Sequence, residues 1–368
     1  MKALFITNKN DLNADILGGV QLCSQEFLEV IRLVCDSVQI FDVDVAKNLK
    51  YRFIRKIGLD YYHLYNVKQY KINLIEFIQN NEINTVFLNK AELMRFSKII
   101  KDAFGNKVKI VLMSHGNESG DFLHQLSHPN ITIAPFKLLI NKFRLGLNLY
   151  IESYFRHRFI DLVFAMSVEE EAIEKWLGSK NTFFFPRLIH DNKIIRNPTY
   201  GRIGFVGTLN HNPNNVALKQ ICDILVQNSF SGEFRIVGSG EIEGKLLVDK
   251  YKFVTYCGRL NDNELKHELS TWVCFLNPIF WYSRGASMKL AQALGWGLPV
   301  ISTIAGARGY KFKKDFLILT SNNAQSFVTK ILEYEFIKTT PQNASLHFSS
   351  IFYTADEIAK DFKNIIEQ

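Results

Sequence analysis

The sequence predicts an α/β protein of two domains, each with a parallel sheet covered by helices. Three observations support this prediction. The composition is that of a globular protein, with 47% hydrophobic and 22% charged residues in a chain of 368, which excludes disordered, collagen-like and coiled-coil classes. Short β-rich runs alternate with longer amphipathic stretches, as in parallel sheets with crossover helices. This alternation also restarts near residue 200, so that each half is long enough to bury its own core.

The β-rich runs, bounded by turn-forming residues, are expected to be strands. In the first half they are residues 3–7, 37–41, 85–88, 108–114 and 162–165. In the second half they are residues 202–206, 234–237, 254–256, 273–276, 299–302 and 316–319.

The two series of strands set the expected domain boundaries. We predict an N-terminal domain at 1–185, a linker at 186–200, a C-terminal domain at 201–345, and a C-terminal helix within 346–368 that packs back on the N-terminal domain. The linker contains Pro186 and Pro198 and a polar cluster, which are typical of connecting segments. Thr354 and Glu357 have the spacing of a capping box, which predicts a helix start.

The hydrophobic segments, the cysteines and the net charge of the sequence predict where the protein is located and which partners it binds. No stretch of the sequence has the roughly 20 apolar residues that a membrane-spanning helix needs, and the N-terminus runs directly into a strand-like segment rather than a secretory signal. We therefore expect a cytoplasmic protein. Its five widely spaced cysteines predict reduced structural thiols. The net charge of +8 favours an anionic partner, which on composition alone is a nucleotide diphosphate, an acidic lipid surface or a nucleic acid.

Three glycine-bearing turns in the second half each follow a predicted strand. They contain Gly207, Gly238 and Gly258. In an open parallel sheet, ligands bind at the carboxyl ends of strands, where glycine lets the backbone approach a phosphate or a base. Three such turns in order favour a ligand site over unrelated turn glycines.

A loop that leads into a helix near Ser287 is the second candidate element. It contains Arg284 and Gly285, and Lys289 and Gln292 follow three residues apart on one side of the helix. Backbone amides at a helix start, together with these cations, form a place that holds a diphosphate without metal. In that geometry the lysine contacts a phosphate and the amide contacts a ribose hydroxyl. The alternative interpretation is a solvated lysine and glutamine on a surface helix.

The order of these turns, together with the segment Gly297-Leu-Pro-Val-Ile-Ser-Thr, resembles the C-terminal domain of glycosyltransferase family 4. The resemblance extends over nearly the whole chain. It implies the GT-B fold, in which two Rossmann-like domains have parallel sheets that face each other across a cleft. It also implies that residues 1–185 bind the acceptor and 201–345 bind a nucleotide-sugar donor. A hexosyl-type transfer with retention of configuration, without metal or another cofactor, follows from the same resemblance.

The sequence departs from the family pattern at several charged positions. The two glutamates of the usual helix motif are replaced by Arg284 and Gln292, and a family variant with Gly-x-x-x-Lys before the same ending matches Gly285 and Lys289 better. The usual Gly-Arg after the first strand is Gly207-Thr208 here, and the lysine expected shortly afterwards is absent. Lys289 and Arg284 are therefore expected to replace both cations at the donor diphosphate.

The resemblance also assigns candidate site residues in both domains. A histidine after a strand and the two cations give the catalytic candidates His115, Lys289 and Arg284. The glycine loops, the base-side pair and the diphosphate helix give the donor-binding candidates Gly18, Gly19, Gly207, Thr208, Gly238, Arg259, Leu260, Gly285, Ala286, Ser287, Met288, Leu290 and Gln292. Two loop carboxylates and a strand-end serine give the acceptor candidates Glu118, Asp121 and Ser167.

Two basic, aromatic segments in the N-terminal domain suggest how an acceptor is reached. Residues 136–155 place large apolar side chains on one helix face among lysines and arginines, and residues 47–56 are similarly basic. Such helices suit the inner face of an anionic cell membrane that presents a lipid-linked acceptor, whereas the alternative is packing against the sheet. No nucleic-acid motif accompanies the charge, so no nucleic-acid partner is expected.

The expected function is transfer of a sugar from a nucleotide-sugar to a glycan or lipid-linked acceptor in the synthesis of a surface polysaccharide or an O-antigen-type glycan. Two alternatives stay open. One is a degenerate, non-catalytic protein that binds a sugar nucleotide or a partner, which the missing glutamates favour. The other is a nucleotide-sugar epimerase, which the missing cleft carboxylates disfavour.

Overall fold

The computed structural model describes residues 1–13, 19–57, 60–127, 133–280, 285–312, 317–334 and 352–366. The chain divides into two compact units. The N-terminal unit comprises Met1–Arg187 with Ser283–Gly285 and Thr354–Gln368, and the C-terminal unit comprises Leu188–Tyr282 and Ala286–Tyr353. Gly18 and Arg284, two of the predicted site residues, lie outside the described residues.

The N-terminal unit is built on a six-stranded parallel sheet in the order β2-β1-β3-β4-β5-β6. Its strands are β1 (Lys2–Thr7), β2 (Ser37–Asp42), β3 (Thr85–Asn89), β4 (Lys109–Met113), β5 (Leu162–Ala165) and β6 (Thr182–Phe184). The five strands expected from the sequence are all present. The sixth, β6, has only three residues, and such a short run gives no periodicity from which a strand is predicted.

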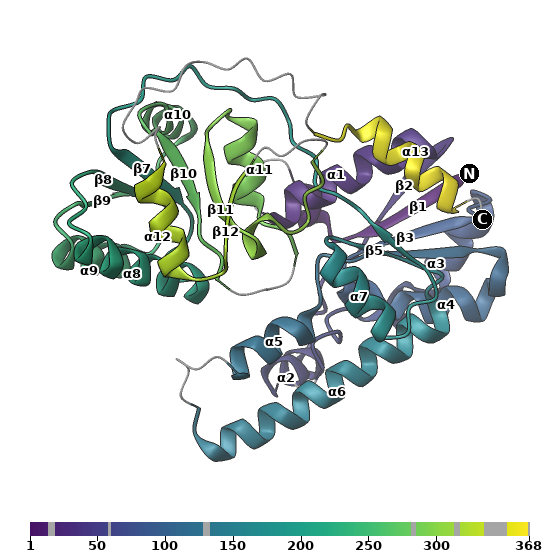
Figure 1. The fold of residues 1–368 in the computed structure, drawn as a ribbon. Helices are drawn as coiled ribbons and strands as arrows, with labels where there is room; N and C mark the ends of the chain where they lie inside the picture. The colour runs from purple at the N-terminus through teal and green to yellow at the C-terminus, as the bar shows by residue number, and fades with distance from the viewer. Residues whose placement is uncertain are drawn as a thin grey trace. The chain divides into compact units, whose positions relative to one another are not determined.

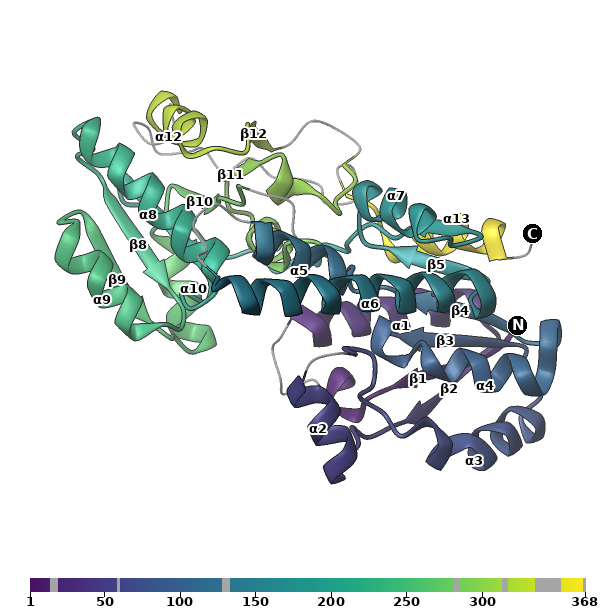
Figure 2. The same ribbon diagram turned by 90° about the horizontal axis from the view of Figure 1, so that it is seen from below.

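Helices connect these strands (Figures 1 and 2). They are α1 (Gly19–Val34), α2 (Leu49–Ile57), α3 (Val67–Asn80), α4 (Arg95–Phe104), α5 (Glu118–Ser127), α6 (Pro135–Phe159) and α7 (Val168–Trp176), with short 3-10 turns at Lys9–Leu12, Ala91–Leu93 and Gly105–Lys107. None of the helices in the described part of the chain combines the length and the apolar character that crossing a bilayer requires.

The C-terminal helix, α13 (Ala355–Ile366), belongs to the N-terminal unit and packs on α1 (Figure 1). Its predicted capping box is confirmed, since the Thr354 amide donates to Glu357 Oε2 at 2.9 Å and the Glu357 amide donates to Thr354 Oγ1 at 3.3 Å. The Phe362 ring is fully buried, with its centroid 4.7 Å from that of Phe164 and 6.1 Å from that of Phe87. Residues from opposite ends of the sequence therefore share one core.

The C-terminal unit has a second six-stranded parallel sheet, in the order β12-β11-β10-β7-β8-β9. Its strands are β7 (Arg202–Val206), β8 (Glu233–Val237), β9 (Val254–Gly258), β10 (Cys274–Asn277), β11 (Val300–Thr303) and β12 (Ile318–Thr320). Its helices are α8 (Asn212–Gln227), α9 (Glu241–Lys250), α10 (Asp262–Ser270), α11 (Met288–Gly295) and α12 (Ala324–Glu333), with a 3-10 turn at Ala305–Ala307. All six expected strands are present.

Gly204, in the middle of β7, gives this sheet room for its largest buried side chain. A Cβ atom at Gly204 would lie 2.2 Å from the indole ring of Trp272, which is fully buried. The indole is held in place because its Nε1 donates to Glu268 Oε1 at 2.8 Å. Only a glycine on the central strand therefore fits this packing.

We expect Gly204→Ala to lower the free energy of unfolding by about 1–3 kcal/mol, because the added methyl must displace a fixed, buried indole. Gly146→Ala is the matched control. A Cβ atom at Gly146, on α6, meets no atom within 4 Å, so this change should stabilise the helix by up to about 1 kcal/mol. Denaturant-induced unfolding measures both effects, and equal stability of the two variants would contradict the packing argument.

Candidate functional site

The candidate donor site lies at the carboxyl ends of β7, β8 and β9 in the C-terminal unit. The chain runs from β7 outward to β8 and β9 and then returns to place β10 on the other side of β7. In open parallel sheets, ligands bind outside the carboxyl ends of the strands at such a reversal. The predicted glycine turns follow these strands directly.

The three turns lie against one another through their backbones. The Gly207 amide donates to Val237 O at 2.9 Å, and the Gly238 amide donates to Gly258 O at 2.8 Å. Gly238 has a φ of +143°, and a Cβ atom there would lie 2.0 Å from Gly207 O. No residue with a side chain fits this position, so the close approach of the first two turns requires glycine.

Lys289, in the first turn of α11, lies directly beside the first of these turns. Its Cε atom is 3.0 Å from the point that a Cβ atom at Gly207 would occupy. Its ammonium lies 4.9 Å from the centroid of the Phe205 ring and donates to Asn214 Oδ1 at 2.7 Å. The lysine predicted from the sequence and the first glycine turn are therefore neighbours.

Asn214 is a site residue that the sequence did not reveal. It lies in the first turn of α8 with 3% of its surface exposed. Its Nδ2 donates to Thr208 O at 2.7 Å while its Oδ1 accepts from Lys289. The amide thus fixes both the turn after β7 and the lysine, but an asparagine at a helix start is usually a solvated or capping residue, which leaves no signal in the sequence.

Lys289 carries a positive charge, and its described partners are neutral. Burial lowers the pKa of its ammonium from 10.5 to about 8. An amide oxygen and an aromatic ring are neutral partners, and Lys289 forms no ion pair with any residue that the structure describes. At neutral pH the site therefore holds a protonated cation without a counter-charge from these residues, which is the arrangement that an anionic ligand satisfies.

The remaining donor candidates occupy varied positions. Thr208, Arg259 and Gln292 are exposed, and Ser239 Oγ donates to Thr208 Oγ1 at 3.2 Å. Leu260 is half-buried and packs on the core beneath the third turn. Gln292 faces solvent one turn after Lys289, so its predicted ribose contact stays a prediction.

Two backbone amides in the first turns of α11 have hydrogen-bond partners within the C-terminal unit. Leu290 is fully buried in the core, and its amide donates to Ser287 O at 3.0 Å. The Ala291 amide donates to Tyr310 Oη at 3.1 Å. Leu290 was predicted to bind the donor; its side chain is buried in the core and its N–H is hydrogen-bonded to Ser287 O, and the donor contact stays a prediction. Ala286, Ser287 and Met288 are half-buried, and Ser287 Oγ donates to Asn277 Oδ1 at 3.0 Å.

In the N-terminal unit, His115 follows β4 as predicted. Its Nε2 lies 2.9 Å from Asn89 Oδ1, and its ring meets the edge of Phe27 with centroids 5.2 Å apart. Because Asn89 Nδ2 donates to Thr7 Oγ1 and Ser24 Oγ, the Asn89 oxygen is the acceptor and His115 Nε2 is assigned as a donor. Three strand ends therefore fix the orientation of this half-buried imidazole.

The other candidates of this unit divide into two groups. Gly19 opens α1, and Glu118 and Asp121 lie half-buried in the first turn of α5. Ser167 is fully buried, and its hydroxyl caps α7 by accepting from the Glu170 amide at 3.1 Å. The capping bond and the burial show a structural role for Ser167, and its predicted acceptor contact stays a prediction. Glu170 also accepts a hydrogen bond from the amide of Gly285.

A buried charged network holds the loop that carries His115. Arg156 on α6 pairs with Glu174 on α7 through two nitrogens, and both side chains are essentially inaccessible to solvent. Burial by itself would lower the pKa of Arg156, but the pairing with Glu174 raises it above the ordinary value. Glu174 Oε1 also accepts from Ser114 Oγ at 3.3 Å. The residue before His115 is thereby attached to the ion pair.

Glu152, one helical turn before Arg156, holds the other side of the same loop. It accepts from Asn117 Nδ2 at 3.0 Å, from the Ser119 amide at 3.2 Å and from the hydroxyl of Tyr62. Burial, followed by the nearby Glu152 charge, raises the pKa of Tyr62 well above its usual value. The hydroxyl therefore stays a donor, and the loop from Ser114 to Ser119 is fixed at both ends.

The comparisons with known proteins agree with this architecture. Residues 201–334, about a third of the chain, match the model of the family described as Glycosyl transferases group 1. No curated protein sequence matches the chain. The structure described as the apo form of the lipopolysaccharide outer core galactosyltransferase WaaB has a TM-score of 0.62 at 14% identity, with 100% of this chain and 99% of that chain covered.

Two further solved structures are similar over the whole chain. Sucrose-phosphate synthase from Thermosynechococcus elongatus has a TM-score of 0.65 at 15% identity, with 100% of this chain and 98% of that chain covered. The Anabaena protein HepE in complex with UDP and glucose has a TM-score of 0.58 at 13% identity, and both chains are covered completely. At these identities the likeness concerns the fold, and the chain has the GT-B fold of two Rossmann-like α/β units.

The network predicts a large stability loss on removal of its cation. Arg156→Met leaves two buried carboxylates uncompensated and should lower the free energy of unfolding by about 3–5 kcal/mol. Lys175→Met, on the adjacent α7, removes a cation from an exposed pair with Glu171 and should cost less than about 1 kcal/mol. Thermal and denaturant unfolding distinguish the two, and similar losses in both variants would contradict this role of the network.

Proposed function

We propose that the protein is a glycosyltransferase that uses a nucleotide-sugar donor, with the donor diphosphate bound beside Lys289 in the C-terminal unit. The observation that supports this proposal is the partly buried ammonium of Lys289, whose described partners are neutral, next to glycine turns that let a phosphate approach the backbone. The match of residues 201–334 to the Glycosyl transferases group 1 model covers the same loops.

In the proposed reaction, the bond between the sugar and the diphosphate breaks while the acceptor hydroxyl oxygen attacks the same carbon, and the leaving diphosphate accepts the proton of that hydroxyl. Negative charge grows on the leaving diphosphate, so a cation fixed there stabilises the transition state more than the ground state. Lys289 supplies that charge, Asn214 positions it, and Arg284 adds a second cation. No metal is needed in this scheme, and retention of configuration through front-side attack is proposed from the resemblance to family 4.

The N-terminal unit is proposed to present the acceptor. His115, with its ring oriented by Asn89, orients the sugar or the acceptor, and the half-buried Glu118 and Asp121 are candidates for contacts with an acceptor hydroxyl. Because HepE is described in complex with UDP and glucose, and another structure of it in complex with UDP-glucose, UDP-glucose is the first donor to test.

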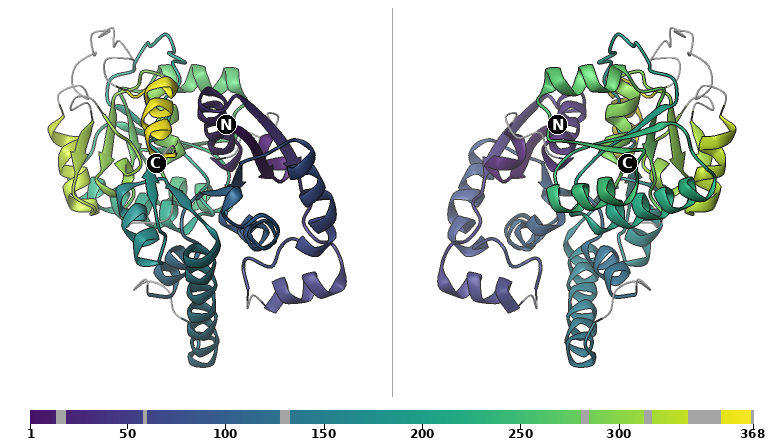
Figure 3. Two further views of the ribbon diagram at one scale, coloured as in Figure 1. Left: turned by 90° about the vertical axis from the view of Figure 1, so that its right-hand side faces the viewer. Right: turned by 90° about the vertical axis from the view of Figure 1, so that its left-hand side faces the viewer.

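We further propose that the acceptor is reached at an anionic membrane surface in the synthesis of a surface glycan. Leu49 and Phe53 on α2 are 82% and 65% exposed, and Phe136 and Phe143 on α6 are 75% and 67% exposed. Figure 3 shows the N-terminal half of α6 extending beyond the sheet of its unit. Lysines and arginines on the same helices complement an anionic bilayer into which these apolar side chains insert.

Lys289→Met is expected to weaken UDP binding or donor turnover by on the order of 100-fold or more, because a cation at developing phosphate charge is lost. The unliganded variant should be at least as stable as the wild type at pH 7. At that pH the ammonium is charged, and its lowered pKa means that burying it reduces the free energy of unfolding. Lys266→Met, an exposed lysine of α10, is the control. Unchanged UDP affinity in Lys289→Met would refute the assignment.

The affinity for UDP should also depend on pH with a definite sign. An anion binds the protonated ammonium, whose pKa in the unliganded protein is about 8. Above about pH 7, where the terminal phosphate of UDP is already ionised, the affinity is therefore nearly constant below pH 8 and falls by up to tenfold per pH unit above it. Isothermal calorimetry from about pH 7 to pH 9.5, with and without a chelator, measures this dependence. An affinity that rises with pH, or one that the chelator abolishes, would contradict the proposal.

Product formation separates the enzyme from the two alternatives. Transfer of labelled glucose from UDP-glucose to an acceptor supports the transferase, and interconversion of the nucleotide sugar without an acceptor indicates an epimerase. UDP binding with neither reaction, across a panel of glycan and lipid-linked acceptors, indicates the non-catalytic alternative that the replaced glutamates favour.

Membrane binding is tested with vesicles of phosphatidylcholine containing phosphatidylglycerol. Phe143→Ser should reduce cosedimentation with these vesicles several-fold, because one inserted aromatic side chain is lost. Ile72→Ser, on α3 with 69% exposure, should leave it unchanged. Equal binding by the two variants, or binding to neutral vesicles alone, would rule out this surface.

A further inference from the structure

A separate basic pocket lies at the amino ends of β4, β5 and β6, whereas His115 lies beyond the carboxyl end of β4. Lys109 is the first residue of β4, Asp161 directly precedes β5, and Lys180 and Asn181 directly precede β6. His115 follows the other end of β4, roughly 20 Å away along the strand direction. The pocket has a volume of about 380 Å³, and it is independent of the glycosyltransferase proposal.

The charges around this pocket do not cancel. Lys101 pairs with Asp161 at 2.7 Å and also donates to Val108 O at 3.1 Å. The same carboxylate oxygen accepts from the Ile110 amide at 2.8 Å, so Asp161 is engaged in tying α4 to the sheet. Lys109 and Lys180 add two positive charges, and among the residues that the structure describes no second carboxylate lines the pocket. The described lining residues therefore carry a formal net charge of about +2.

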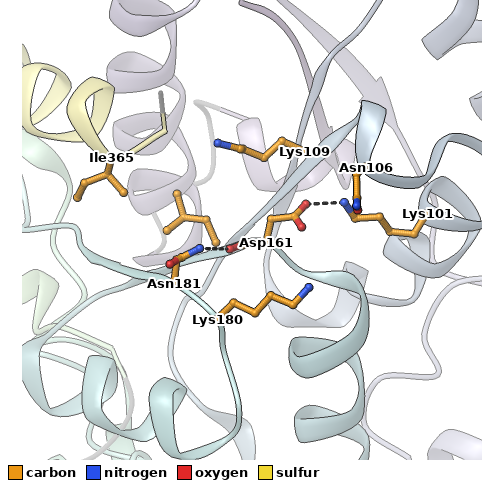
Figure 4. A pocket seen from close by; sticks show the side chains of 8 residues that line it. Lys101, Asn106, Lys109, Asp161, Lys180, Asn181 and Ile365 are labelled. Atoms are coloured by element: carbon orange, nitrogen blue, oxygen red, sulfur yellow. Dashed lines mark hydrogen bonds and ion pairs between the residues drawn. The ribbon is translucent and has the colours of Figure 1, made fainter. Parts of the chain in front are cut away.

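Lys109 and Lys180 lie on either side of Asp161, and the Lys101 ammonium is directed at the Asp161 carboxylate (Figure 4). The ammonium of Lys109 donates to the Ile366 carbonyl at the end of α13, which fixes its direction but gives no counter-charge. Lys180 has no hydrogen-bond or ion-pair partner among the described residues. Asn181 Nδ2 donates to Asp161 O at 3.2 Å, and Asn106 adds a second side-chain amide to the lining.

We propose that this pocket binds a phosphate monoester. Lysine side chains from three segments line this one pocket. They suit a group with several acceptor oxygens, and a dianion matches the excess formal charge of about +2 on the described lining residues. The volume exceeds that of phosphate itself and lies in the range of small-molecule sites, so the group belongs to a phosphorylated molecule such as a sugar phosphate. A short lipid headgroup has the same chemistry.

Ligand binding here also stabilises the attachment of α13. Ile365 lines the pocket, and the contact between Lys109 and Ile366 O joins its wall to the end of that helix. A ligand that contacts this wall binds more tightly when α13 is packed on the unit, and it therefore favours the packed state by mass action. Amide hydrogen exchange in α13 should slow when the pocket is filled.

The test is a calorimetric titration with inorganic phosphate and with glucose 1-phosphate at constant ionic strength. We expect one saturable site, a dissociation constant raised at least about tenfold by Lys180→Gln and by Lys109→Gln, and slower exchange in α13. Lys71→Gln, an exposed lysine of α3 in the same unit, is the control and should bind as the wild type does. Among the described residues, Lys180 has no hydrogen bond or ion pair that its replacement would break, so this variant still tests the proposal if Lys109→Gln fails to fold.

Two further arms identify the site and the source of the phosphate. Binding must persist in Lys289→Met, since loss there would assign the signal to the donor site and overturn this proposal. Dihexanoyl phosphatidic acid, used below its micelle-forming concentration, represents the lipid headgroup. Tighter binding of this lipid than of glucose 1-phosphate would identify a lipid source, and the reverse order a water-soluble one. Absence of binding by all three probes, or binding that Lys180→Gln leaves intact, would refute the pocket.

Discussion

The candidate donor site depends on the direct backbone contact between the Gly207 and Gly238 turns. A Cβ atom at Gly238 would overlap the Gly207 carbonyl, so side chains are excluded from the point where β7 and β8 end. That exclusion leaves space beside the first turn, and Lys289 occupies part of it, with its Cε atom close to Gly207. The absence of side chains on the adjoining turns gives Lys289 room beside Gly207, and burial at this position lowers the pKa of its ammonium.

The two units differ in whether a buried cation is paired with a carboxylate. In the N-terminal unit, Arg156 donates to the Glu174 carboxylate and to the backbone carbonyl of Glu152, and neighbouring hydroxyls and amides donate to the two carboxylates. Such a compensated network fixes a loop but has little capacity to bind an added ion. Lys289 in the C-terminal unit has neutral partners among the described residues, so it is costly in the unliganded protein and available to an anion. This contrast is the physical basis for placing the donor at Lys289 and a positioning role at Arg156.

The positive net charge of the chain is distributed over features with different chemistry. Lys289 is a single ammonium beside glycine turns, which suits a diphosphate. The helices α2 and α6 combine cations with exposed apolar rings, which suits a bilayer interface. Lys101, Lys109 and Lys180 surround a hollow at the amino edge of a sheet, which suits a small phosphorylated ligand. Composition predicted an anionic partner, but only the positions of the lysines separate these three kinds of anion.

The sequence by itself determined the α/β architecture, the strands of both sheets except β6, the start of α13 and the glycine turns after β7, β8 and β9. These features depend on local periodicity, on capping spacing and on glycine, all of which are readable in a short window. Tertiary structure decided the rest. It placed Leu290 in the core and made Ser167 a helix cap, and it made Asn214 the partner of Lys289. It also assembled the network of Glu152, Arg156 and Glu174 from segments distant in sequence. Hydrogen bonds and burial depend on which segments meet in space, and no local pattern of residue types records that.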